Sequence, residues 1–170
     1  MKNTIKLFAL TVAFLALSIS TFAQVSATAT TSATVITPIA IAKTVDMNFG
    51  SIAVSPTLAG TVVLATGGTR TKTGGVTLPA VTGTVAAAAF TVSGLGTSTY
   101  SITLPGTITL TGNPSGSMTV GTFVSNPAGT GALTAGTQTV QVGGTLNVGA
   151  AQAAGTYTNS TDMTVTVNYN

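Results

Sequence analysis

Few side chains in this sequence could act as acids, bases, nucleophiles or metal ligands. The chain has no His, Cys, Glu or Trp, and its only acidic side chains are Asp46 and Asp162. Catalysis by proton transfer or nucleophilic attack needs titratable or activated groups, and a transition metal needs imidazole, thiolate or carboxylate ligands. An enzyme would have to rely on the two separated Asp residues, Lys43, Lys72 and a few Tyr. We therefore expect a non-catalytic protein with no catalytic residue, metal site or cofactor.

The segment 44–50 carries an Asp and an Asn whose side-chain oxygens could contribute to a calcium site. Calcium takes about six to eight oxygen ligands, usually from several carboxylates, and the second Asp of this chain is far away in the sequence. The structural interpretation is therefore preferred to the metal site. In this interpretation Met47 and Phe49 point inward, and Gly50 allows a bend.

Two cations lie in the stretch 66–75, where Arg70 and Lys72 stand between two glycine pairs. Backbone N–H groups of a glycine-rich loop can bind an anion, so contact with an anionic glycan or lipopolysaccharide is one hypothesis. The spacing is not that of a phosphate-binding loop, and no helical pattern follows. We expect the tip of a long hairpin, with cations that are solvated or that discourage pairing at a sheet edge.

The first 23 residues have the pattern of a secretory signal peptide. Lys2 and Lys6 precede an apolar run from Leu7 to Leu17, and small residues precede Gln24 at the positions that a signal peptidase reads. An uncleaved membrane anchor is the alternative, but the apolar run is shorter than the roughly 20 residues needed to span a bilayer. We expect an exported protein at the cell surface or outside the cell.

Loss of the two lysines in this signal peptide would lower the formal net charge from +3 to +1. So small a charge does not indicate a nucleic-acid partner. An exported chain without Cys also has no disulfide framework, so its stability must come from burial and β-pairing.

Alternation of apolar and polar residues with a period of two runs through much of residues 100–169. The alternating apolar positions are Tyr100, Ile102, Leu104, Ile108, Leu110, Val140, Val142, Leu146, Val148, Met163, Val165, Val167 and Tyr169. This period is typical of half-buried strands, and Gly or Pro turn residues such as Gly143-Gly144 punctuate them. The pattern predicts an all-β sandwich or barrel. A disordered low-complexity chain is the alternative, which the positive mean hydropathy disfavours.

Residues 24–42 differ in texture from the rest of the chain. After Gln24, the stretch to Thr34 consists of Ala, Ser and Thr with only Val25 larger, and the more apolar stretch that follows is broken by Pro38. It could be a flexible leader that joins a first strand, or a long extended segment that pairs with a sheet edge. We predict a signal peptide over 1–23, an extended leader or donor strand over 24–42, and a β-sandwich domain over 43–170.

Several pieces of the sequence together carry a family resemblance. They are Ala27–Thr30, Asp46–Gly50, Phe90–Gly94, Tyr100–Pro105, Gly144–Gly149, Ala154–Tyr157 and Thr164–Tyr169. The combination resembles the bacterial domain-of-unknown-function family 4402. It is similar, more distantly, to spore-coat-protein-U-type and archaic chaperone–usher pilin subunits. That likeness implies an immunoglobulin-like β-sandwich that lacks one strand, which the N-terminal segment of a neighbouring subunit completes.

The residues themselves fit such strand donation. The candidate donor positions are Val25, Ala27, Ala29, Thr31, Ala33, Val35, Ile39 and Ile41, and the candidate groove strand carries Met163, Val165, Val167 and Tyr169. A surface with so few charges also lacks the usual protection against association between sheet edges. We expect self-association or association with a related subunit, and the pilin likeness implies a periplasmic chaperone and an outer-membrane usher.

The leading hypothesis is a secreted structural protein, a pilin-like subunit of a surface filament or extracellular matrix. The alternative is a monomeric binding or adhesion module for a cell-surface glycan. Sugar sites usually present stacked aromatic rings, and this chain has no Trp and only Tyr100, Tyr157 and Tyr169. The sequence leaves open whether the leader pairs with its own domain or with another copy.

Overall fold

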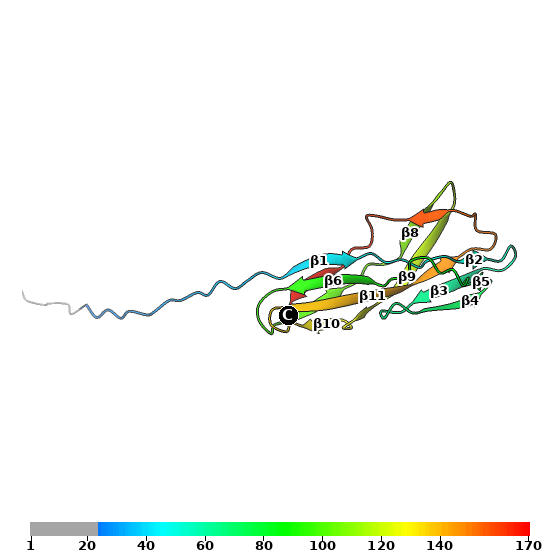
Figure 1. Cartoon of the computed structure of the whole chain (residues 1–170). Helices are drawn as coiled ribbons and strands as arrows, with labels where there is room; N and C mark the ends of the chain where they lie inside the picture. Colours follow the sequence, from blue (N-terminus) through cyan, green and yellow to red (C-terminus); the bar gives the residue numbers. More distant parts are fainter. Residues whose placement is uncertain (1–23) are drawn as a thin grey trace, which may run out of the picture. The chain divides into compact units, whose positions relative to one another are not determined.

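The computed structural model describes residues 24–170 (Figure 1). The predicted signal peptide, residues 1–23, lies outside the described part. The chain divides into two units, the second of which spans Ile36–Asn170. In the first unit, residues 24–35 are extended and belong to no strand, and the side chains of Val25 and Val35 are 92% and 96% exposed. No helix among the described residues is long and apolar enough to cross a membrane.

The second unit is built from β-strands, which confirms the all-β fold class that the period of two predicted. The strands are β1 (Ala40–Val45), β2 (Ala53–Val54), β3 (Gly60–Leu64), β4 (Arg70–Gly74), β5 (Val76–Thr77), β6 (Ala88–Ser93), β7 (Thr99–Thr103), β8 (Ile108–Asn113), β9 (Ser117–Asn126), β10 (Thr130–Ala132), β11 (Thr137–Val148), β12 (Thr156–Thr158) and β13 (Thr166–Tyr169). The unit begins at Ile36 and β1 begins at Ala40. Residues 40–42, which the sequence assigned to the leader, therefore belong to the domain, where they pair with β6.

The strands form one large curled sheet and two small sheets. The large sheet has the antiparallel order β1-β6-β11-β9-β8-β12, with β3 also paired to β11 and β4 to β3. The second sheet has the order β10-β7-β13, and β2 pairs with β5. Strand β11 is the spine of the large sheet, because β6 pairs with its first half, β3 with its second half and β9 with its other edge.

The glycine pair Gly143-Gly144 lies inside β11, so the expectation of a turn there is wrong. It marks the point where the partner on one edge of β11 changes from β6 to β3. A Cβ atom on Gly143 would collide with the Leu64 carbonyl oxygen, and one on Gly144 would press on the ring of Phe123. Glycine is needed here because other backbone and side-chain groups approach closely.

The core lies between the faces that the alternation predicted to be buried. One cluster joins β6 and β11 of the large sheet to β7 and β13 of the second sheet, and it contains the buried side chains of Tyr100, Val140 and Val167. A second cluster is formed mainly by β3, β8, β9 and β11. Phe49 is buried and Met47 is partly buried, as expected. The structure therefore confirms the sandwich architecture, in which two sheets bury one face each.

The stretch 66–75 is not a long hairpin tip, contrary to the sequence prediction. The tip is confined to residues 65–69, and Arg70–Gly74 forms β4 at the edge of the large sheet. Threonines on alternate positions suit a strand, and the hydroxyls of Thr61 and Thr73 lie 2.8 Å apart across the pair. Arg70 and Lys72 are thus strand residues.

Candidate strand-acceptor groove

The C-terminal stretch 156–169 is one nearly continuous antiparallel partner of residues 100–113. Strand β12 pairs with β8 and strand β13 with β7 in the same register: Thr158 faces Thr111, and Thr166, eight residues after Thr158, faces Thr103, eight residues before Thr111. Between the two strands, Asn159 Nδ2 donates a hydrogen bond to the Thr109 carbonyl at 2.8 Å. Within residues 24–170, no strand pairs with the opposite edge of this stretch.

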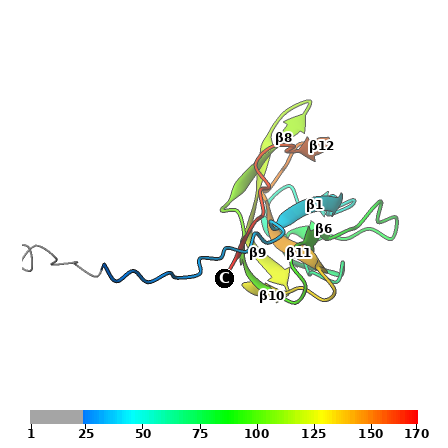
Figure 2. The same cartoon turned by 90° about the vertical axis from the view of Figure 1, so that its left-hand side faces the viewer.

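A second unpaired edge belongs to β1. Strand β1 uses one edge to pair with β6 and is the last strand of the large sheet on that side. Further along, Asn48 forms an isolated bridge with Ala86, which continues the same line of the chain. Figure 2 shows β1 and the pair of β8 and β12 on the two sides of an opening in the curled sheet. Two strand edges therefore face each other across this opening.

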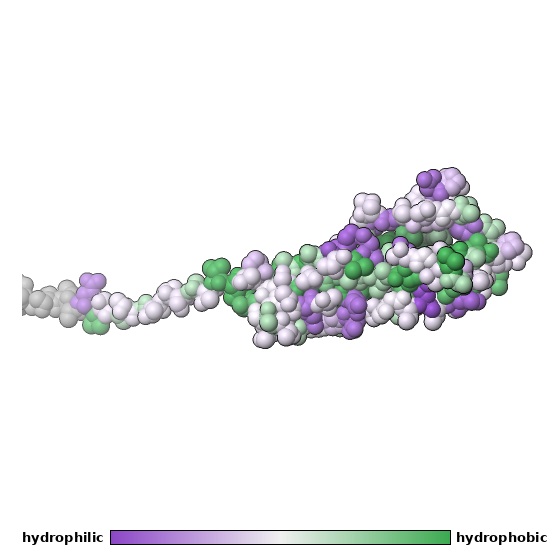
Figure 3. Space-filling model, in the orientation of Figure 1, coloured by the Kyte–Doolittle hydropathy of each residue, from purple (hydrophilic) through white to green (hydrophobic). Residues whose placement is uncertain are grey.

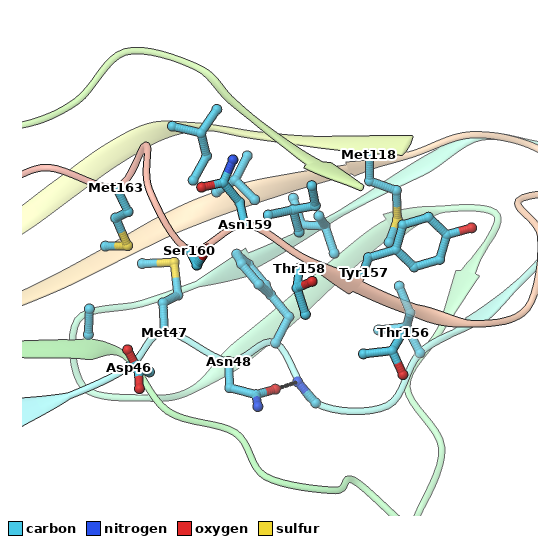
Figure 4. Close-up of a pocket in the computed structure, with 18 of the residues that line it drawn as sticks. Asp46, Met47, Asn48, Met118, Thr156, Tyr157, Thr158, Asn159, Ser160 and Met163 are labelled. Atoms are coloured by element: carbon cyan, nitrogen blue, oxygen red, sulfur yellow. Dashed lines mark hydrogen bonds between the residues drawn. The ribbon is translucent and has the colours of Figure 1, made fainter. Parts of the chain in front are cut away.

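A groove of about 840 Å³ lies between these edges. Its apolar lining comes from six separate parts of the chain and includes Val45, Met47, Phe49, Ile52, Ala88, Phe90, Ile108, Leu110, Met118, Val120, Leu146 and Met163. The space-filling view shows hydrophobic surface in the hollow beneath the β8 end of the domain (Figure 3). The close-up shows the side chains of Met47, Met118 and Met163 together with the segment from Thr156 to Ser160 that borders the groove (Figure 4).

The rim next to β1 is held by local polar contacts. Lys43 Nζ pairs with Asp46 Oδ1, so these two charges neutralise each other. Asn48 Oδ1 accepts a hydrogen bond from the Gly50 N–H at 2.8 Å, and Gly50 has φ = 67°. Arg70 Nη1 donates hydrogen bonds to the carbonyls of Phe49 and Ser51. This network fixes the bend that the sequence predicted at Gly50.

The opposite rim is held by Tyr157 and by an Asn–Asp turn. Tyr157 Oη donates to the Ala153 carbonyl at 2.6 Å and accepts from Gln152 Nε2 at 2.8 Å. Asn159 Oδ1 accepts the N–H groups of the two residues that precede Met163. The pKa of the Asp162 carboxyl is lowered mainly by the side-chain hydrogen bond from Asn159 and to a smaller extent by the one from Thr161. Both rims are therefore ordered while the groove between them stays open.

The predicted donor positions fall into two groups in the structure. The alternating residues from Val25 to Val35 lie in the extended first unit and are exposed. By contrast, Ile39 and Ile41 pack against the core cluster of their own domain, and Ile41 pairs with Val92 in β6. The last two residues of the expected donor segment therefore belong to the domain, because burial against β6 covers their apolar side chains.

The predicted groove residues take different places in the structure. Val165 and Val167 are buried in the core, Met163 lines the groove, and Tyr169 is the last residue of β13. The sequence patterns did not predict Met118, Phe90 or Val120 as groove residues, because these residues come from distant strands. One signal was available: residues 24–170 contain only three Met, and all three line this groove.

The two candidate anion-contact residues, Arg70 and Lys72, both lie on strand β4. The Arg70 guanidinium is directed at backbone carbonyls near the groove rim, while Lys72 is exposed on β4. These hydrogen bonds make the guanidinium less available to an external anion, and the anion contact stays a prediction.

A protein-family model described as Domain of unknown function (DUF4402) matches residues 39–169. The chain belongs to this family. The match begins one residue before β1 and ends with the last residue of β13, so it covers the whole β-domain, including both edges of the groove. No curated protein and no solved structure matches the chain. The family description carries no activity, so a functional proposal must rest on the groove.

Proposed function

We propose that this protein is a non-catalytic structural subunit that assembles by β-strand addition. The observation that carries the proposal is the groove, where the free edge of β1 and the free edge of residues 156–169 face each other above an apolar floor. An extended strand placed there would pair its backbone with an exposed sheet edge and bury alternate side chains on the floor. Strand addition of this kind needs no catalytic group.

The extended first unit is the candidate donor. Its residues alternate between one row of Val, Ala and Thr and another of Ser and Thr, which suits a strand with one face buried and one exposed. Exposed apolar residues such as Val25 and Val35 would be covered by binding. We extend the proposal to a pilin-like filament or matrix at the cell surface, after export directed by residues 1–23, with a periplasmic chaperone and an outer-membrane usher as partners.

A glycan-binding module is the weaker proposal for this geometry. Stacking on sugars needs accessible aromatic faces, and Tyr100 is completely buried. The hydroxyls of Tyr157 and Tyr169 are bonded to neighbouring backbone groups. A strand fits the long apolar floor and the two polar edges better than a sugar does.

The test uses the mature chain, residues 24–170, with Ala29→Pro and Ala33→Pro in the leader. Proline has no N–H, so these changes should block strand pairing by the leader and leave the domain unaltered. We expect the unmodified chain to form multimers in size-exclusion chromatography and an SDS-resistant ladder before heating, and the proline variant to be monomeric. The matched control, Thr28→Ser with Thr30→Ser, should still assemble.

The domain of each variant is checked by its thermal unfolding midpoint, which should be unchanged. Multimers that persist in the proline variant would contradict donation by the leader. An unmodified chain that remains monomeric under all these conditions would contradict the assembly proposal and favour the monomeric binding module.

A further inference from the structure

The methionines of this protein are concentrated at the groove. Met47 follows β1, Met118 is in β9 and Met163 precedes β13, and all three line the groove (Figure 4). Met47 and Met163 are partly buried, and each packs against both core clusters. Outside the groove, the described core consists of Val, Ile, Leu, Ala, Phe and Tyr.

Methionine gives the groove a property that the rest of the core lacks. Its side chain is unbranched, has three rotatable bonds and adapts to irregular gaps, which is why it is frequent at adaptable binding surfaces. The β-branched Val and Ile residues of the remaining core are stiff at their first torsion. The floor can therefore change its shape when a strand enters, with little disturbance of the sheets.

The candidate donor carries unusually small side chains on its alternating row. The row Val25, Ala27, Ala29, Thr31, Ala33 and Val35 contains three Ala residues, and no residue from 24 to 42 is charged. A stiff floor would leave a void over each Ala, and voids in a core are destabilising. The neutral donor also matches a groove lining in which the charged residues, Lys43 and Asp46, pair with each other.

The length of the segment also fits. Eleven residues in extended conformation span about 36 Å, which is the length needed to run along β12 and the non-strand segment 159–165 to the start of β13. We propose that the groove takes residues 25–35 of a second copy of this chain, and that Met47, Met118 and Met163 fill the room left by the donor alanines. This inference rests on the proposed function, and it adds the partner and the basis of its selection.

The experiment measures binding of a labelled peptide, residues 24–37, to the full mature chain that carries Ala29→Pro and Ala33→Pro. This acceptor cannot use its own leader, so its groove is open to the peptide. Peptides with Ala27→Leu, Ala29→Leu or Ala33→Leu test larger donor side chains. We expect the Leu peptide whose side chain faces the methionines to bind about tenfold more weakly than the unmodified peptide, because overpacking is destabilising.

The matching acceptor variants are Met47→Ala and Met163→Ala, each in the same proline background. Each should bind the unmodified peptide about tenfold more weakly and recover binding to one Leu peptide, since residues in contact show coupled rather than additive effects. Met163→Leu is the control and should bind the unmodified peptide within about threefold, because it conserves volume. Thermal unfolding of every variant separates loss of folding from loss of binding.

The possible outcomes separate a failure of the inference about the methionines from a failure of the proposed function. If the unmodified peptide does not bind, donation by the leader fails. If it binds but all peptide and acceptor changes combine additively, the role of the methionines is overturned. If a Leu peptide binds the unaltered groove more tightly than the unmodified one does, the groove is shaped for a larger donor and the partner is a different chain. If one acceptor variant does not fold, the other variant with the three Leu peptides decides between these outcomes.

Discussion

The hydroxyl of Tyr169 donates a hydrogen bond to the carbonyl of Thr37 at 2.9 Å, across 132 residues of sequence. The same oxygen accepts the N–H of Leu95 at 2.7 Å. Gly94 makes this approach feasible, because a Cβ atom there would collide with the Tyr169 hydroxyl. One phenol at the end of β13 therefore joins the entry of the domain to the turn after β6.

Removal of this hydroxyl should destabilise the domain. Tyr169→Phe loses the hydrogen bonds to Thr37 and Leu95, so the free energy of unfolding should fall by about 1–2 kcal/mol. Urea unfolding of the mature chain measures the change. Ser101→Ala is the control, since it removes one exposed hydrogen bond of 3.3 Å and should change stability by no more than about 0.5 kcal/mol. Equal unfolding midpoints for Tyr169→Phe and the unmodified chain would contradict the prediction.

Tyr100 and Gln138 should tolerate substitution unequally. The buried Tyr100 hydroxyl donates to Gln138 Oε1 at 2.6 Å, and the Ala132 N–H donates to the same oxygen at 2.9 Å. Gln138→Leu leaves the buried Tyr100 hydroxyl without a partner and should lower the free energy of unfolding by about 2 kcal/mol or more. Tyr100→Phe leaves Gln138 one partner and should lower it by about 1 kcal/mol.

Urea unfolding of both variants tests this order. Gln141→Leu, on the same strand β11, is the matched control and should change stability by no more than about 0.5 kcal/mol. A larger cost for Tyr100→Phe than for Gln138→Leu would contradict the prediction, because Tyr100→Phe keeps the ring and removes only the hydroxyl.

The same tyrosine should make the domain sensitive to alkaline pH. Burial raises the pKa of Tyr100 above its ordinary value of 10.0. Above about pH 10 the unfolded chain loses this proton while the folded chain keeps it, so the unfolded state binds fewer protons and stability falls as pH rises. Unfolding free energies from about pH 9 to about pH 11 should decline less steeply for Tyr100→Phe, because the other titrating groups are common to both proteins. Parallel curves for the two proteins would contradict the prediction.

Arg70 should stabilise the groove rim. Arg70→Met keeps the aliphatic stem but loses the hydrogen bonds to the carbonyls of Phe49 and Ser51, which should cost about 1–2 kcal/mol because the group is partly exposed. Lys72→Met, two residues along the same strand, is the control and should lie within about 0.5 kcal/mol of the unmodified chain. Urea unfolding distinguishes the two variants. Equal stability of both variants, with a polyanion stabilising only the chain that has Arg70, would instead support an anion-binding role.

Much of the fold follows from local patterns in the sequence. The alternation around Val165 and Val167, and around Val140 and Val142, predicts strands with one buried face, because successive side chains of a strand point to opposite sides. The inward direction of Phe49 and the bend at Gly50 follow from the same reasoning. These features need only neighbours within a few residues.

Other features depend on partners that are distant in the sequence. The sequence predicts a turn at the glycine pair in β11, and only the close approach of β3 and the Phe123 ring explains why glycine is needed there. The sequence likewise predicts that Arg70 is a loop cation, and only the tertiary structure brings it to the carbonyls near Gly50. Likewise, the sequence does not separate residues Ile39 to Ala42 from the rest of the leader. Their place in the domain depends on β6, with which residues 40–42 pair.

The groove is the clearest case of this division. Composition alone predicts a protein whose backbone edges and apolar faces make the contacts, because few side chains could act as acids, bases or metal ligands. Nothing local connects Met47, Met118 and Met163, which are more than forty residues apart along the chain. Only the curling of the large sheet brings them together between two unpaired edges, because the way strands are ordered in a sheet is set by long-range pairing and not by the period of any one strand.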